Sequence, residues 1–220
     1  MKAMERIISD SMDLWEEAVA VLFLAELGKG AVDKELFLNY IVQDSIYLRY
    51  YIKAFAMGMY KAETLKNMQF FYSVLGFVND SENATRLSYL KEAGMTDDDV
   101  ESVPMTKACR SYASFLINTA EKGSLEEILM AVMPCMLGYG YVFKKTLEKW
   151  PEVMKTHYAP LVSDYTAPWY DEYCDAWTEY CDKRLEGLGE DEIRKLSAVF
   201  REASRQELIF WQMAGGDDHE

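Results

Sequence analysis

Three side chains able to do covalent and proton-transfer chemistry lie on the apolar faces of three separate predicted helices. They are Asp44, Cys135 and Glu207. An ionised cysteine is a nucleophile, and two carboxylates in different environments can divide acid and base work between them. A carboxyl group on an apolar face must also find partners, because burying an unpaired charge is costly. If the helices pack as one bundle, these three groups can converge on one pocket.

The segment around Cys135 breaks the usual rules for helix stability. Pro134 removes a backbone donor, while Gly138 and Gly140 weaken a helix and permit close approach of a ligand or another backbone. Such lapses are commoner at functional or strained sites than elsewhere. Taken alone, however, a buried cysteine is usually a small hydrophobic residue. The case for catalysis therefore rests on the combination of the thiol with the two carboxylates.

Tyrosines accompany each of these groups. Tyr139 lies four residues after Cys135 and shares its helix face. Tyr47 and Tyr112 lie on the apolar faces of two other predicted helices, where a buried hydroxyl needs a partner. We expect these three tyrosines to line the pocket.

Helical periodicity predicts the elements that carry these residues. Prolines number five, and the chain has few of the turn signals that an all-β protein needs. Apolar residues recur instead at i, i+3, i+4 and i+7, which predicts an all-α, multi-helix bundle. The predicted helices cover residues 12–28, about 34–62, 64–77, a further helix through 90, 106–121, 124–149, 170–185 and 191–213. A polar break at residues 79–81 separates the third and fourth, and the acidic run 97–99 is a solvated loop or a helix start without assigned function.

The periodicity also predicts which side chains are buried. In the first helix they are Leu14, Ala18, Val21, Leu22 and Ala25. In the second they are Phe37, Tyr40, Ile41, Tyr47, Leu48, Tyr51 and Phe55, with Asp44 in the same face. In the last they are Leu196, Phe200, Ala203, Phe210 and Trp211, with Glu207 among them.

Composition limits the class of protein. The chain has 220 residues, 50% of them hydrophobic, and no linker-like stretch, so we expect a single domain over residues 1–220. A formal net charge of −14 disfavours nucleic acid and anionic membranes as partners. The N-terminus carries charges where a signal peptide has its apolar core, and no uninterrupted apolar run reaches the length of about 20 residues that spans a bilayer. We therefore expect a cytoplasmic protein.

Metal and haem chemistry find little support in the spacing of potential ligands. The four cysteines form no C-x-x-C pair, so free thiols are expected in a reducing compartment. His157 and His219 are the two histidines of the chain. Neither belongs to the Glu-x-x-His pairs of a di-iron bundle, and neither lies inside a predicted helix as a haem ligand would. Ser-His-Asp chemistry is disfavoured by the same shortage of histidine, and no glycine-rich phosphate loop is present.

Three segments together resemble a known family. Residues 37–48 resemble the F-x-x-Y-x-x-Q-D-x-x-Y-L signature of TenA/thiaminase II proteins. Residues 134–139 are similar to the P-C-x-x-G-Y segment of that family, and residues 207–211 to its C-terminal E-x-x-F-W. Each motif alone is weak, but the three occur in the family's order and spacing over essentially the whole chain.

The resemblance implies a fold and an activity. It implies a haem-oxygenase-like helical bundle, assembled as a homotetramer and working without a cofactor. It implies hydrolysis of aminopyrimidines in thiamin salvage: 4-amino-5-aminomethyl-2-methylpyrimidine to the hydroxymethylpyrimidine, and cleavage of thiamin itself. By the same resemblance Cys135 adds to the ring, Glu207 moves protons, and Asp44 binds the amidine-like edge. Tyr47, Tyr112 and Tyr139 position the ring and orient these groups.

Two positions depart from the family pattern. Residues 168–173 match a P-x-Y-x-E-W segment with Tyr173 in place of the tryptophan, so the resemblance makes Tyr170 a further binding residue. Ser45 stands where the family often has an aromatic residue, which can alter the fit of the substrate.

Two alternatives stay open. One is a non-catalytic pyrimidine-binding or regulatory protein on the same fold, which the retained thiol and carboxylates disfavour. The other is a hydrolase of a different substituted pyrimidine, because one pocket side chain can change substrate choice while the chemistry persists.

Overall fold

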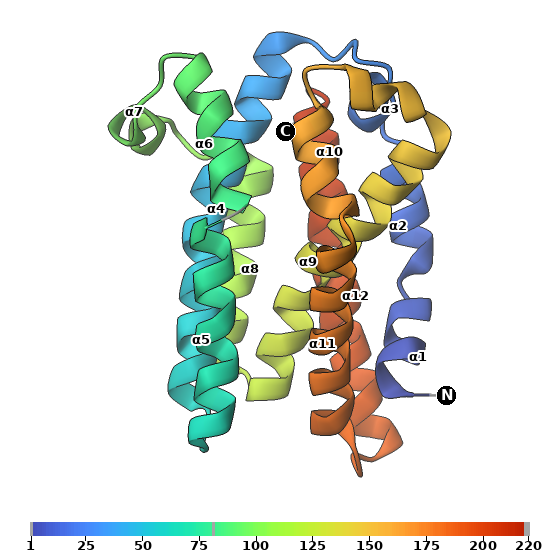
Figure 1. Ribbon diagram of the computed structural model, residues 1–220. Coiled ribbons are helices and arrows are strands. Elements are labelled where there is room, and N and C mark those ends of the chain that lie inside the picture. Colours follow the sequence, from blue (N-terminus) through green and yellow to red (C-terminus); the bar gives the residue numbers. More distant parts are fainter. Residues whose placement is uncertain (1, 81, 218–220) are drawn as a thin grey trace.

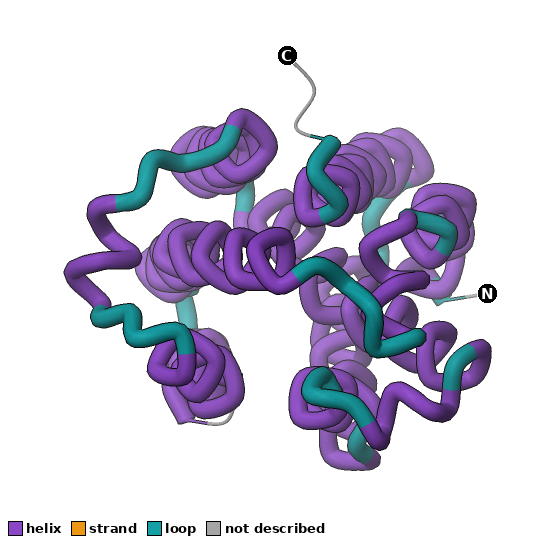
Figure 2. Tube along the Cα trace, turned by 90° about the horizontal axis from the view of Figure 1, so that it is seen from above, coloured by secondary structure: helices purple, strands orange, loops and turns teal. Residues whose placement is uncertain are grey.

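The chain folds into a bundle of long helices (Figure 1). The computed structural model describes the backbone of residues 2–80 and 82–217 and the side chains of residues 2–73 and 84–217. Within those ranges the α-helices are α1 (Ala3–Ser9), α2 (Met12–Val19), α3 (Leu22–Gly28), α4 (Lys34–Lys61), α5 (Leu65–Asp80), α6 (Glu82–Glu92), α7 (Asp97–Ser102), α8 (Lys107–Lys122), α9 (Leu125–Lys149), α10 (Ala159–Thr166), α11 (Pro168–Leu185) and α12 (Glu190–Ala214). A 3-10 helix, η1 (Pro151–Lys155), follows α9. No strand occurs in the described part of the chain (Figure 2), so the prediction of an all-α bundle is confirmed.

Helix α9 occupies the centre of the bundle. It packs against α12, α10, α4, α8, α11 and α2, and its side chains from Ile128 to Met136 are all buried. A helix that is apolar on every side belongs inside a protein core or a membrane. By length and composition α9 could cross a bilayer, but 78% of the apolar window is buried inside the protein. This burial is what a central bundle helix requires.

Local signals in the sequence set where the site-bearing helices begin. Asp33 caps α4 by accepting hydrogen bonds from the backbone N–H groups of Glu35 and Leu36. Thr106 caps α8 in the same way. Ser124 and Glu127 form a reciprocal capping box at the start of α9. The predicted bounds of these three helices therefore hold to within a residue or so.

The prediction of one helix over residues 12–28 was wrong. The chain forms α2 and α3 instead, with an extended backbone at Val21 between them. The first half buries Leu14 and Ala18 as expected. The second half buries Phe23, Leu24 and Leu27, whereas Leu22 is 64% exposed. The apolar stripe loses its helical phase between the two halves, and the break lets each half turn its own face inward.

Other expectations fared better or fall partly outside the described residues. The acidic run 97–99 forms the first turn of α7, where Thr96 and Asp99 make a capping box. The predicted faces of α4 and α12 are buried as expected. Helices α1 and α10 carried no prediction. The predicted break at residues 79–81 was placed too early, because α5 continues through Asp80. Ser81 and the side chains around it lie outside the described residues, as does His219.

Candidate active site

Glu207 of α12 forms the clearest polar contact in the core. The hydroxyl of Tyr112 on α8 donates a hydrogen bond to Oε1 of Glu207, with 2.7 Å between the oxygens. Both side chains are buried, Tyr112 at 1% and Glu207 at 5% exposure. Burial raises the pKa of Tyr112 well above its ordinary value, and the neighbouring Glu207 and Cys135 raise it further. Tyr112 therefore keeps its proton and remains a donor to the carboxylate.

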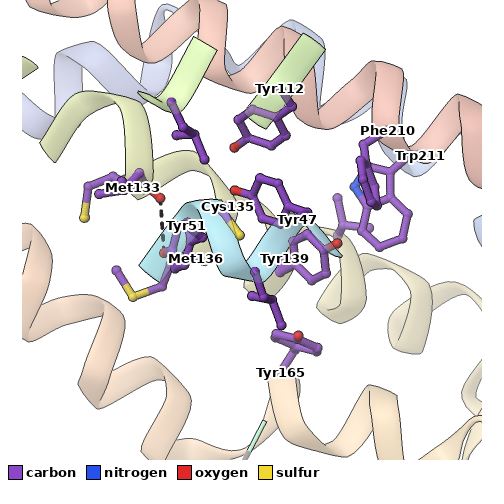
Figure 3. Packing of buried hydrophobic residues seen from close by; sticks show 14 of the residues in the cluster. Tyr47, Tyr51, Tyr112, Met133, Cys135, Met136, Tyr139, Tyr165, Phe210 and Trp211 are labelled. Carbon is purple, nitrogen blue, oxygen red and sulfur yellow. Dashed lines mark hydrogen bonds between the residues drawn. The ribbon is translucent and has the colours of Figure 1, made fainter. Parts of the chain in front are cut away.

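Cys135 lies beside this pair. Its helix continues through Pro134, and its side chain is buried in the aromatic core. The rings of Tyr47 and Tyr112 pack with centroids 4.6 Å apart, and Figure 3 shows their hydroxyls on the side where the Cys135 sulfur lies. Burial raises the pKa of Tyr47 well above its ordinary value, with further contributions from Cys135, Tyr112 and Glu207. A thiol, a carboxylate and two phenol hydroxyls thus share one buried region.

Tyr139 connects Asp44, the third predicted catalytic group, with the region of Cys135 and Glu207. It lies one helical turn after Cys135, and its hydroxyl accepts a hydrogen bond from the Tyr40 hydroxyl at 3.5 Å. Its pKa is raised, first by burial and then by Tyr40, Asp44, Glu207 and Cys135. All three predicted catalytic groups therefore act electrostatically on one phenol. The structure brings together Asp44, Cys135 and Glu207 from α4, α9 and α12.

Asp44 sits at the less enclosed side of this group. It is half-buried on α4, and its charge also contributes to the raised pKa of Cys109, which burial chiefly causes. The preceding residue, Gln43, joins α4 to the start of α8: its side-chain amide donates to the Pro104 carbonyl and accepts from the Thr106 N–H, each at 3.0 Å. These two hydrogen bonds hold α4 in place against the start of α8, and so they set the position of Asp44 relative to α8.

Tyr170 occupies a different kind of position. Its hydroxyl donates to the backbone carbonyl of Met136 at 2.8 Å, directly after Cys135. Its ring packs on Gly140, where an added Cβ would lie 3.1 Å from Cε1 of Tyr170. The glycine thus admits the ring, and the hydroxyl is occupied by the backbone. The contacts of Tyr170 link α11 to the turn of α9 that carries Cys135.

Several aromatic residues of this region carried no predicted site role. Phe210 and Trp211 follow Glu207 and pack on Tyr47 and Tyr139 respectively. Tyr165 of α10 lies 5.1 Å from Tyr139 between ring centroids (Figure 3). The E-x-x-F-W segment pointed to the first two. Tyr165 lies in a helix that the periodicity did not predict, so its approach to the site depends on the tertiary fold.

The other cysteines have different surroundings. All four are free thiols. Burial raises the pKa of Cys109 and Cys174 to about 12 and raises that of Cys181 further, so these three thiols stay protonated at neutral pH. Over the described residues, no group of three or more His, Cys, Asp and Glu side chains is arranged to hold a metal ion. Cys135 is the thiol that acts together with Glu207 on the pKa of Tyr47 and Tyr112.

Comparison with known proteins identifies the family. A sequence profile described as the TENA/THI-4/PQQC family matches residues 10–216. The chain belongs to this family. The helical motifs at residues 37–48, 134–139 and 207–211 all fall inside the matched range, so the resemblance inferred from them is confirmed.

Relatives and solved structures agree with this assignment. An aminopyrimidine aminohydrolase from Halalkalibacterium halodurans is 29% identical over 202 residues, covering 91% of this chain and 90% of that protein. An aminopyrimidine aminohydrolase from Helicobacter pylori is 26% identical, covering 97% and 99%. A domain from Shewanella denitrificans described as having a heme oxygenase-like fold superposes with a TM-score of 0.77 at 13% identity, covering 97% and 92%. The fold of this family member is therefore haem-oxygenase-like.

Proposed function

We propose that this protein is an aminopyrimidine aminohydrolase of thiamin salvage, with Cys135 as nucleophile, Glu207 as acid and base, and Asp44 as the residue that binds the amidine-like edge of the ring. The observation that carries the proposal is the buried Tyr112–Glu207 hydrogen bond beside Cys135. A flat heterocycle set among these groups would meet a sulfur, a proton donor and a second carboxylate at once. The names of the family relatives supply the substrate class.

The first half of the reaction breaks the bond to nitrogen. The Cys135 thiol passes its proton to the Glu207 carboxylate and adds as thiolate to a ring carbon, and the displaced electron pair moves to a ring nitrogen that takes this proton from Glu207. The electron-rich adduct then expels the ammonium group of the aminomethyl substituent as ammonia, which leaves an exocyclic methylene. Tyr112 holds Glu207 through its hydrogen bond, so the proton donor keeps one orientation during this step.

The second half restores the ring. Water adds to the methylene carbon and passes a proton to Glu207. The sulfur leaves and takes this proton, which restores the Cys135 thiol and the Glu207 carboxylate. The ring nitrogen gives its proton to the released ammonia, and the ring regains aromaticity. Tyr47 and Tyr139, both buried and both protonated because burial raises their pKa, position the ring and supply hydroxyl donors. The sum is an aminomethylpyrimidine and water converted to a hydroxymethylpyrimidine and ammonia, without a cofactor.

The proposal extends to Tyr170, to the location of the protein and to its assembly. Tyr170 is proposed to hold the Cys135 turn of α9 in place, since its hydroxyl is bound to the Met136 carbonyl. A cytoplasmic location is part of the proposal, and the net charge of −14 supports a protein that acts on neither nucleic acid nor anionic membranes. A homotetramer is the expected assembly by family resemblance, and light scattering of the purified protein measures it.

The decisive experiment follows ammonia release from 4-amino-5-aminomethyl-2-methylpyrimidine. Wild-type protein is expected to release ammonia, and Cys135→Ser to lose at least 1,000-fold in kcat, on the scale seen when a nucleophile is removed. Cys174→Ser is the matched control, because that thiol is half-buried on α11, where its acidic neighbours are Asp171 and Asp175 rather than Asp44 and Glu207. Binding of the pyrimidine without turnover by the wild type, or full activity of Cys135→Ser, would contradict the proposal.

A further inference from the structure

A cavity of about 640 Å³ lies apart from the Cys135 region. It opens to solvent and is lined by the loop before α4, the first turns of α4, the end of α6 and the turn between η1 and α10. Neither Cys135 nor Glu207, Asp44 or any of the predicted site tyrosines lines it. Its volume falls in the range of about 300–1,000 Å³ that small-molecule sites occupy.

The floor of the cavity is aromatic and fixed in place. Phe37, Tyr89 and Tyr158 are each no more than 6% exposed. Phe37 meets Tyr89 edge-on at 4.9 Å between centroids and Tyr158 at 4.7 Å. The hydroxyl of Tyr89 donates to the His157 carbonyl at 2.9 Å and that of Tyr158 to the Val32 carbonyl at 3.1 Å. The backbone occupies both hydroxyls, and the His157 imidazole lies over the rings, with its centroid 5.0 Å from that of Tyr89, 5.7 Å from Tyr158 and 6.4 Å from Phe37. A ligand ring therefore reaches these three rings by taking the place of the imidazole.

The rim supplies the charged groups. Nε2 of His157 lies 3.6 Å from a carboxylate oxygen of Glu92, and the two side chains are 52% and 66% exposed. A pair so open to water contributes little stability, at most about 1 kcal/mol, so the ion pair itself opposes displacement of the imidazole only weakly, and a ligand ring replaces the contacts that the imidazole makes with the aromatic floor. Lys34 also lines the cavity, which gives the rim both signs and directs the donor edge of a ligand toward Glu92.

We propose that this cavity is a second ligand site, which takes a flat aromatic ring bearing an amidinium or similar cationic donor edge. The ring packs on Phe37, Tyr89 and Tyr158, where aromatic contacts and cation–π attraction both stabilise it. The donor edge pairs with the Glu92 carboxylate in a two-point hydrogen bond. The net charge of −14 draws such cations toward the protein. This ligand site does not depend on the proposed hydrolysis of aminopyrimidines.

The histidines make the site easy to test. The chain has two, His157 and His219, so proton NMR of the imidazole resonances resolves them, and a His157→Gln variant assigns the signal. Benzamidine is the probe. The His157 resonance is expected to shift and saturate as benzamidine is added, while the uncharged isostere benzamide binds at least fivefold more weakly. Glu92→Gln should weaken benzamidine binding at least tenfold.

Glu152→Gln on η1 is the control, because Glu152 is an exposed acid outside the cavity. It should leave the dissociation constant within twofold. A His157 resonance that does not move at millimolar benzamidine overturns the proposal. So does saturable binding, measured calorimetrically, that leaves His157 unperturbed or that is equally strong in Glu92→Gln, since the ligand would then lie elsewhere.

Discussion

Removing one hydroxyl, that of Tyr170, should slow catalysis more than it destabilises the fold. Tyr170→Phe keeps the ring that packs on Gly140 but loses the 2.8 Å hydrogen bond to the Met136 carbonyl. A hydrogen bond of this kind contributes about 0.5–1.5 kcal/mol net. For a chain of this length that corresponds to a fall in Tm of about 1–6 °C. The protein should therefore remain folded at assay temperature.

The effect on activity comes from the neighbouring nucleophile. Met136 directly follows Cys135, and a displacement of about 1 Å in a reacting group can cost about 100-fold in rate. We expect Tyr170→Phe to lower kcat for ammonia release about 10- to 100-fold while KM changes less than about threefold. Alkylation of the Cys135 thiol by iodoacetamide should change in rate as well, which reports the position of the sulfur independently of turnover.

Tyr158→Phe is the matched control. Its hydroxyl also donates to a backbone carbonyl, that of Val32 at 3.1 Å, and its side chain is equally buried. The two variants should lose similar Tm, but Tyr158→Phe should keep kcat within about twofold. If Tyr170→Phe retains full kcat, or if both variants lose activity in proportion to their stability, the bracing role of Tyr170 is wrong.

Three further predictions test the site, an ion pair and the packing. Tyr112→Phe removes the hydrogen-bond donor to Glu207 and should lower the free energy of unfolding by about 1.5–3 kcal/mol, the range for hydrogen bonds to charged groups. Thermal unfolding measures this loss, and an unchanged kcat would show that Glu207 does not need the hydrogen bond for catalysis. Arg201 donates two hydrogen bonds of 2.6 Å to the Asp13 carboxylate. Chiefly by that contact it lowers the pKa of Asp13 from 3.8 to about 2. Because this folded-state pKa is depressed, the pair stabilises the fold above about pH 4 and ceases to do so as pH falls through about 2. The difference in Tm between wild type and Asp13→Asn should therefore shrink between about pH 4 and pH 2 and vanish at lower pH. A Cβ at Gly58 would lie 2.6 Å from Cε1 of Phe71, so Gly58→Ala should lower stability by about 1–3 kcal/mol in urea unfolding, and a neutral result would mean that α5 shifts freely.

The sequence by itself determined the helices that carry the site. Period-3.6 patterns and capping residues depend on neighbours within a turn or two, so α4, α8, α9 and α12 could be predicted from local signals. The inward positions of Asp44, Cys135 and Glu207 followed from the same patterns. The break between α2 and α3 could not be found this way, because residues 20 and 21 are compatible with helix and only the burial of Phe23, Leu24 and Leu27 against other helices decides the phase.

The tertiary structure alone decided which groups touch. The partners Tyr112 and Glu207 are separated by 95 residues, and Tyr170 and Met136 by 34. Such contacts depend on how helix faces pack, and no local pattern specifies them. The same holds for Tyr165, which reaches Tyr139 from a helix without a clear periodic signal. Interactions between residues near in sequence thus determine the helices, whereas the site forms only when helices distant in sequence pack against one another.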